Sequence, residues 1–239
     1  NNTRSESFTI PPPNLTATGT VSAPTTIAIG TAMSVSSSVI NNGGSSAGGF
    51  IIRYRLSTNT TYETTDTLLG DYTFTGLSAG ASGSAPWNGT CPNMTTGTYY
   101  LVWRIDDGGT VTESNESDNV FYRSTTITVT APELVVTDIL MNGLTTLPTV
   151  AAGQDVRLDF DVLNQGTAGT IPSVHLQWWW GTSSGAKTNP IATGDIAWFD
   201  GLSPGESERD TDASWIIPNL APGTYWITAE IDYDGRVAE

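Results

Sequence analysis

Residues 97–113, GTYYLVWRIDDGGTVTE, decide the fold, because they return as residues 223–239, GTYWITAEIDYDGRVAE. Apolar side chains alternate in both copies, at Leu101, Trp103 and Ile105 and again at Ile227, Ala229 and Ile231. A period of two is typical of a β-strand with one buried face. A strand that recurs together with the turn after it indicates two homologous domains in tandem.

Three further segments repeat in the same order. They are Pro13–Leu15 with Pro132–Leu134, Val39–Gly43 with Val162–Gly166, and Gly76–Gly80 with Gly201–Gly205. The offset grows from 119 residues (Pro13 to Pro132) to 126 (Glu113 to Glu239), as expected if short insertions fall in loops.

Short runs rich in Val, Ile, Thr, Tyr and Trp alternate with clusters of Gly, Pro, Asn and Ser. This pattern predicts an all-β chain of two tandem immunoglobulin-like antiparallel β-sandwiches. The first is expected at residues 11–130 and the second at residues 131–239, with residues 1–10 left over as an orphan strand.

The composition excludes several classes of function. Nine basic residues against 24 acidic ones give a formal charge of -15, which would repel nucleic acid. Lys187 and His175 are the only residues of their types, and no phosphate-binding loop or nucleophile elbow occurs, so we expect no enzyme. A lone Cys91 excludes an intrachain disulfide.

The same composition indicates where the protein works. No apolar run approaches the roughly 18 residues of a membrane helix. Abundant Ser, Thr, Gly and Asn with a single lysine favour an extracellular or cell-surface location. Because the chain starts at Asn1 rather than methionine, we expect it to be a piece of a longer product.

The motifs of the first copy resemble the CARDB family, the cell-adhesion-related domain found in bacteria. They are Asn41–Gly43, Leu56–Thr58, Asp66–Gly70, Gly76–Gly80, Gly97–Tyr100, Asp106 and Val111–Asn119. The second copy matches at Asn164–Gly166, Gly201–Gly205, Gly223–Tyr225 and Val237–Glu239 but departs at Trp178–Trp180. The resemblance implies an Ig-like sandwich that occurs in tandem in extracellular surface proteins, and it implies no defined ligand.

The two copies end differently. Glu113 is followed by a polar turn and a closing strand at Thr125–Thr130, whereas the second copy stops at Glu239. Residues 2–10 resemble residues 119–129, with Phe8 and Ile10 in the places of Ile127 and Val129. Since a missing edge strand exposes core and backbone groups, we predict that Ser7, Phe8, Thr9 and Ile10 form an assembly strand for a second sandwich.

Two physical accounts fit this arrangement. One is donor-strand complementation, in which other copies of the chain join head to tail in a filament. The other is a continuous tandem array in which the same strand is covalently linked to the preceding sandwich. A boundary that falls inside a repeat is the third explanation.

Six Asn-x-Ser/Thr sequons are candidate sites for covalent glycans, and all lie in the first copy. They are Asn1, Asn14, Asn59, Asn88, Asn93 and Asn115. Because a sequence rich in Ser and Thr also produces such triplets by chance, occupancy stays open.

Two further clusters are candidate sites. Carboxylates at Asp106, Asp107, Glu113, Glu116 and Asp118 offer oxygen ligands for Ca²⁺, although solvated turn carboxylates are the commoner explanation and the spacing matches no EF-hand. Trp178, Trp179 and Trp180 lie in one predicted strand, where they serve either packing, a subunit interface or a sugar-binding platform.

The sequence therefore predicts a structural subunit or repeat of an extracellular, glycosylated filament without cofactors other than Ca²⁺. The alternative is an adhesin or a carbohydrate-binding module of a secreted protein.

Overall fold

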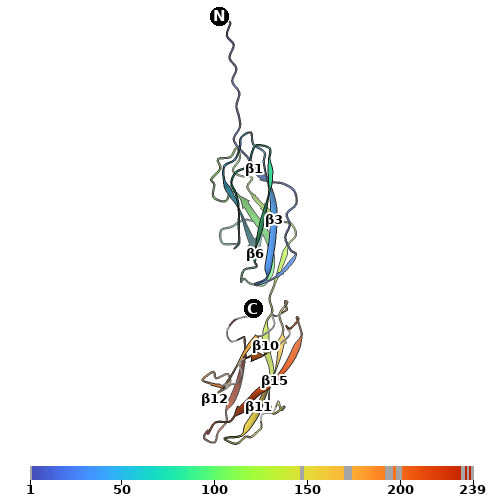
Figure 1. The fold of residues 1–239 in the computed structure, drawn as a ribbon, viewed down its shortest axis with the longest axis vertical. Coiled ribbons are helices and arrows are strands. Elements are labelled where there is room, and N and C mark those ends of the chain that lie inside the picture. Colours follow the sequence, from blue (N-terminus) through green and yellow to red (C-terminus); the bar gives the residue numbers. More distant parts are fainter. Residues whose placement is uncertain are drawn as a thin grey trace. The chain divides into compact units, whose positions relative to one another are not determined.

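The computed structural model describes residues 2–145, 148–169, 174–191, 196–197, 201–232, 235 and 237. The chain folds as two compact units, Asn1–Val129 and Thr130–Glu239 (Figure 1). The described residues form antiparallel β-sheets and no helix, which confirms the predicted all-β class. No helix in this part of the chain is long and apolar enough to cross a membrane.

The first unit contains two sheets. One has the strand order β1-β3-β6 and consists of β1 (Leu15–Ala17), β3 (Ala32–Asn41) and β6 (Ser82–Thr90). The other has the order β2-β9-β7-β4-β5, with β8 also on β7. Its strands are β2 (Thr26–Ala28), β4 (Phe50–Ser57), β5 (Thr67–Phe74), β7 (Gly97–Ile105), β8 (Val120–Tyr122) and β9 (Ile127–Thr130).

The second unit repeats this plan with fewer strands among its described residues. One sheet has the order β10-β11-β15, from β10 (Leu134–Met141), β11 (Asp155–Asn164) and β15 (Ser207–Ile216). In the other, β12 (Val174–Gly181) pairs with β13 (Asn189–Ile191), β14 (Ile196–Ala197) and β16 (Trp226–Ile231).

The pairing register identifies corresponding strands in the two units. Ile52 of β4 lies opposite Ile105 of β7, and Leu176 of β12 lies opposite Ile231 of β16. Strand β16 is therefore the counterpart of β7, and Trp178 stands where the first unit has Tyr54. The Tyr54 hydroxyl donates to the carbonyl of Ala85 at 2.5 Å, which ties the two sheets of the first unit together.

Candidate assembly site

Strand β9 closes one side of the first core. It pairs with the start of β7, with Ile127 opposite Tyr99 and Val129 opposite Gly97. On its other side, the Thr128 N–H donates to the Thr25 carbonyl at 2.8 Å. The Ile127 and Val129 side chains are 0% and 1% exposed, so this strand contributes fully buried apolar surface.

The corresponding position in the second unit holds no strand among the described residues. Strand β16 pairs with β12 on one edge, and no described strand pairs with its other edge. We call that edge, from Gly223 to Ile231, the open position. Its inner side chains Ile227, Ala229 and Ile231 pack against the second core but are only partly buried, whereas Leu101, Trp103 and Ile105 of β7 are buried.

The surroundings of the open position match those of the filled one. The Tyr225 hydroxyl donates to the carbonyl of Ala221 at 2.9 Å, as the Tyr99 hydroxyl does to that of Thr95 at 2.7 Å. Each phenol fixes the chain just before its strand, β7 or β16, begins. The frame of the open position is thus present, and none of the described strands occupies it.

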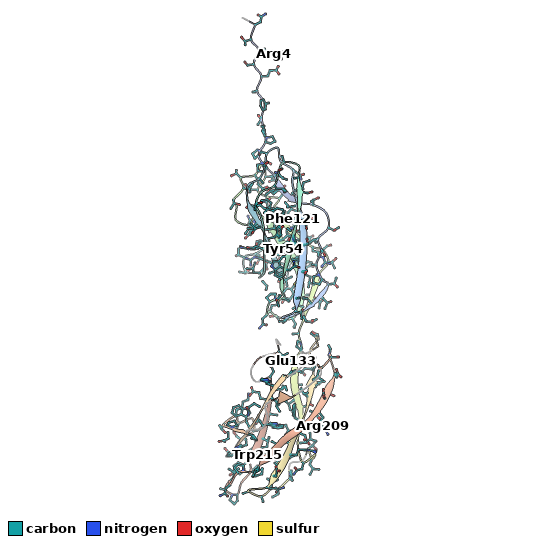
Figure 2. The ribbon with its side chains drawn as sticks, viewed as in Figure 1. Arg4, Tyr54, Phe121, Glu133, Arg209 and Trp215 are labelled. Atoms are coloured by element: carbon teal, nitrogen blue, oxygen red, sulfur yellow. The ribbon has the colours of Figure 1, made fainter. Side chains whose placement is uncertain are left out.

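Residues 2–10 supply unpacked apolar side chains. They adopt no strand in the first unit, lie outside both of its sheets in Figure 1, and carry Arg4, labelled in Figure 2. Phe8 is 87% exposed and Ile10 is 63% exposed. The neighbouring residues Ser7 and Thr9 are also exposed. Burying an apolar side chain of this size stabilises by about 1.5–3 kcal/mol.

A buried asparagine fixes the segment that follows residues 2–10. Asn41, which is 0% exposed, accepts hydrogen bonds at Oδ1 from the backbone N–H groups of Asn14 (3.1 Å) and Gly43 (3.0 Å). Its Nδ2 donates to the carbonyls of Ser45 (2.9 Å) and Leu77 (3.0 Å). All the hydrogen-bonding capacity of this amide is therefore satisfied inside the first unit.

The same clamp recurs in the second unit. Asn164 is 0% exposed and accepts from Glu133 N (3.1 Å) and Gly166 N (3.0 Å). Its Nδ2 donates to the carbonyls of Ala168 (2.8 Å) and Leu202 (2.9 Å). The repeated Asn-x-Gly motif was visible in the sequence, but its role as a buried clamp was not predicted.

The glycine of this motif is required by close packing. A Cβ on Gly43 would lie 2.3 Å from the Pro12 carbonyl oxygen, and one on Gly166 would lie 2.3 Å from the Glu133 nitrogen. Any side chain would displace the incoming backbone. Asparagine and glycine together therefore hold the start of each unit at a fixed place on its sandwich.

Glu113 provides a second attachment for the start of the first unit. Its Oε2 accepts a hydrogen bond from Leu15 N, and its Oε1 accepts one from Asn119 Nδ2 at 2.8 Å. Next to it, Ser114 N donates to the Pro13 carbonyl at 2.9 Å. Burial raises the pKa of Glu113 above 4.5, and these two hydrogen bonds only partly oppose the shift.

The Glu113→Gln variant should be less stable and less sensitive to pH. Glu113 accepts hydrogen bonds from two donors, Leu15 N and Asn119 Nδ2. A glutamine would have to point its NH₂ group at one of them, which lowers the free energy of unfolding by about 1–3 kcal/mol. In the wild type the raised pKa means that the folded state holds its proton more tightly. This contribution is complete below pH 4.5 and is lost as pH rises through the raised pKa. Denaturant unfolding across pH should show this decline in the wild type, and an equal decline in the variant would contradict the assignment.

The other predicted calcium ligands take part in separate contacts. Asp106 is buried with a φ of 50°, and its carboxylate accepts from the N–H groups of Thr110 (3.0 Å) and Val111 (2.8 Å). Asp107 pairs with Arg53 at 2.7 Å. In the described part of the chain, no three His, Cys, Asp or Glu side chains gather as a metal site.

The remaining two acidic candidates also face protein donors. Glu116 Oε1 accepts from Glu113 N at 2.8 Å, and Asp118 Oδ2 accepts from Asn14 Nδ2 at 3.3 Å. Asp232, the counterpart of Asp106, likewise has a positive φ of 52° and accepts from Val237 N at 3.2 Å. Buried Asp106 and half-buried Asp232 thus shape equivalent turns in the two units.

The sequons differ in accessibility. Asn59, Asn88, Asn93 and Asn115 have exposed side chains. Asn14 is half-buried, and its Nδ2, the atom to which an N-linked sugar attaches, donates to Asp118. Asn1 lies outside the described residues. Of the five sequons among the described residues, four therefore have accessible asparagine side chains.

The three tryptophans divide between the two faces of β12, as strand geometry requires. Trp178 is 2% exposed and meets Phe160 edge to face, with ring centroids 5.9 Å apart, so it is not accessible to a sugar. Trp180 packs against the same core and meets Tyr225 at 5.8 Å. Trp179 points to the opposite face and is half-buried. Because Tyr225 belongs to the open position, its contact with Trp180 places Trp180 next to that position.

Comparisons with known proteins match parts of the chain. The CARDB family model matches residues 12–123. No curated protein sequence matches the chain. Among solved structures, the CARDB domain of a Pyrococcus furiosus protein, in complex with di-metal ions, is 22% identical, and the match covers 52% of this chain and 94% of that one with a TM-score of 0.39.

Two other structures are similar over about half of this chain. A domain of a candidate cell surface protein from Methanosarcina acetivorans is 19% identical, over 49% of this chain and 91% of that one, with a TM-score of 0.37. A β-glucosidase from Listeria innocua in complex with glucose is 15% identical, over 49% of this chain but only 16% of the enzyme, with a TM-score of 0.33.

Proposed function

We propose that this chain, of which residues 12–123 match the CARDB family model, is a non-enzymatic structural subunit of an extracellular filament. In this proposal, residues 2–10 of one copy fill the open position of the next copy. One observation carries the proposal. In the first unit, Ile127 and Val129 of β9 are buried beside β7, whereas Phe8 and Ile10, which occupy the same places in the sequence repeat, are exposed. The edge of β16 that corresponds to this side of β7 is the open position.

Charge supports apolar and backbone contacts as the basis of assembly. The formal charge of -15 makes copies repel one another over the Debye length of about 8–10 Å at moderate salt. Attraction must therefore come from apolar burial and from ladder hydrogen bonds along β16. The same charge, with sugars on the exposed sequons, would oppose lateral aggregation of filaments.

The donor and the acceptor are different surfaces of the chain. A contact between unlike surfaces is heterologous, and each added copy brings a new donor and a new open position. Such a contact produces an open polymer unless its rotation closes a ring. A fibre is therefore the expected product.

Imaging of the natively produced protein at a resolution that traces the backbone tests this function. We expect fibres in which Phe8 and Ile10 of one copy occupy the open position of the next. The trace also shows whether each junction is covalent. Isolated monomers with residues 2–10 outside any sandwich would overturn the proposal and make sugar-binding assays the next measurement.

A further inference from the structure

We infer that the donated strand binds in one register, with Phe8 opposite Tyr225, Thr9 opposite Thr224 and Ile10 opposite Gly223. This inference rests on the proposed function and specifies its contact. It predicts that the strand runs antiparallel to β16 and lies between β16 and residues 148–150. The open position would then be a slot with two sides rather than a free edge.

The register follows from two independent offsets. Residues 4–15 align with residues 123–134 at a constant offset of 119, which places Arg4 on Arg123, Phe8 on Ile127 and Leu15 on Leu134. Residues 97–113 align with residues 223–239 at a constant offset of 126. In the first unit, β9 residues 127, 128 and 129 lie opposite β7 residues 99, 98 and 97. Subtracting 119 from the β9 numbers and adding 126 to the β7 numbers gives the three pairs proposed for the donated strand.

The second side of the slot is formed by the counterpart of β2. The turn after β2 and the turn after residues 148–150 have the same geometry, with positive φ at Gly30 (74°) and Gly153 (77°). Each turn also has the same backbone hydrogen bond, from Thr31 N to Ala28 O (3.2 Å) and from Gln154 N to Ala151 O (3.1 Å). These turns align residues 25–31 with residues 148–154 at an offset of 123, so that Pro148 corresponds to Thr25.

A proline at this position is compatible with strand insertion. In the first unit Thr25 uses its carbonyl to accept the Thr128 N–H. Pro148 lacks an N–H but keeps its carbonyl, which can accept the N–H of Thr9 in the same way. Val150, the counterpart of Ile27, already packs against the second core.

The side chains fit the register. Ile127 and Tyr99 are buried opposite each other in the first unit, so Phe8 should meet Tyr225 on the inner face. Tyr225 already contacts Trp180 edge to face at 5.8 Å. Phe8 would add a third ring to this pair, and aromatic pairs are favourable beyond the area they bury.

The contact extends toward the start of the donor. In the first unit, Arg123 N donates to the Leu101 carbonyl at 2.9 Å. The same offsets pair Arg4 N with the carbonyl of Ile227. The register therefore uses most of residues 4–10, and it leaves Thr9 facing outward, as Thr128 does.

Disulfide trapping tests the register. In the first unit the Thr128 N–H points away from β7, so Thr98 and Thr128 form a non-hydrogen-bonded pair, the closer type with Cα atoms about 4.5 Å apart. This spacing lies within disulfide range. In a Cys91→Ala background, the Thr9→Cys/Thr224→Cys double variant should give a ladder of covalent multimers on a non-reducing gel.

A two-residue slip provides the matched control. Ser7→Cys/Thr224→Cys should cross-link at least tenfold less under the same oxidation. Cross-linking of the slipped pair at an equal or higher level would overturn the register, as would the absence of cross-links from either pair in protein that sediments as polymer. Protein that sediments as monomer without cross-links would overturn the proposed function itself.

Discussion

Replacing Asn41 with aspartate should destabilise the first unit more than any other single conservative change discussed above. The amide donates to the carbonyls of Ser45 and Leu77 at 2.9 and 3.0 Å from a site with no solvent exposure. A carboxylate there leaves both carbonyls without a donor and places a negative charge against them. Burying an unpaired charge costs about 3–5 kcal/mol, a large share of the 5–15 kcal/mol that stabilises a typical domain.

The neighbouring residue provides a control with the same chemical change. Asn42 is exposed, so Asn42→Asp should alter the free energy of unfolding by less than about 0.5 kcal/mol. Denaturant titrations of both variants, followed by circular dichroism and by hydrogen exchange of β3 amides, measure the difference. Similar stability of the two variants would show that Asn41 is not a clamp.

Replacing Phe8 and Ile10 with aspartate should abolish assembly. Each substitution removes an apolar side chain whose burial contributes about 1.5–3 kcal/mol and adds a charge to the second core. Because 1.4 kcal/mol corresponds to a tenfold change in affinity, the double variant should assemble at least about 100-fold more weakly. Sedimentation velocity over a concentration series measures this effect.

Thr9→Asp is the matched control for the double variant. It adds the same type of charge between the two positions, on the face that Thr128 exposes in the first unit. It should keep most of the assembly. A synthetic peptide of residues 2–13, added to the double variant, should raise the unfolding temperature of the second unit by filling the open position. Equal assembly of all variants, or a peptide without effect at saturation, would contradict strand donation.

The sequence was informative where local rules decide the structure. The repeat of residues 97–113 and the alternation of Leu101, Trp103 and Ile105 predicted paired strands, and the all-β class followed. The same alternation predicted that Trp178 and Trp180 lie on one face of their strand and Trp179 on the other, and the structure confirms this.

The roles of the polar residues depended on tertiary contacts that spacing does not show. Asn41 and Asn164 are clamps because distant carbonyls, such as those of Leu77 and Leu202, lie within reach of their amides. Asp106 was a candidate calcium ligand, yet its oxygens accept backbone N–H groups of its own turn. A buried polar side chain is defined by its partners, and these come from elements far apart in the sequence.

The placement of the two ends of the first unit has a mechanical consequence. The incoming segment is attached at Glu113 and Ser114, beyond the end of β7, whereas the outgoing strand β9 leaves beside Gly97 at the start of β7. A pull on the two ends therefore draws β9 lengthwise along β7 and β2, so that its hydrogen bonds carry the load together rather than opening one after another. In the proposed filament the donated strand at each junction would be loaded in the same shear geometry, so that its hydrogen bonds with β16 would share the tension on the fibre.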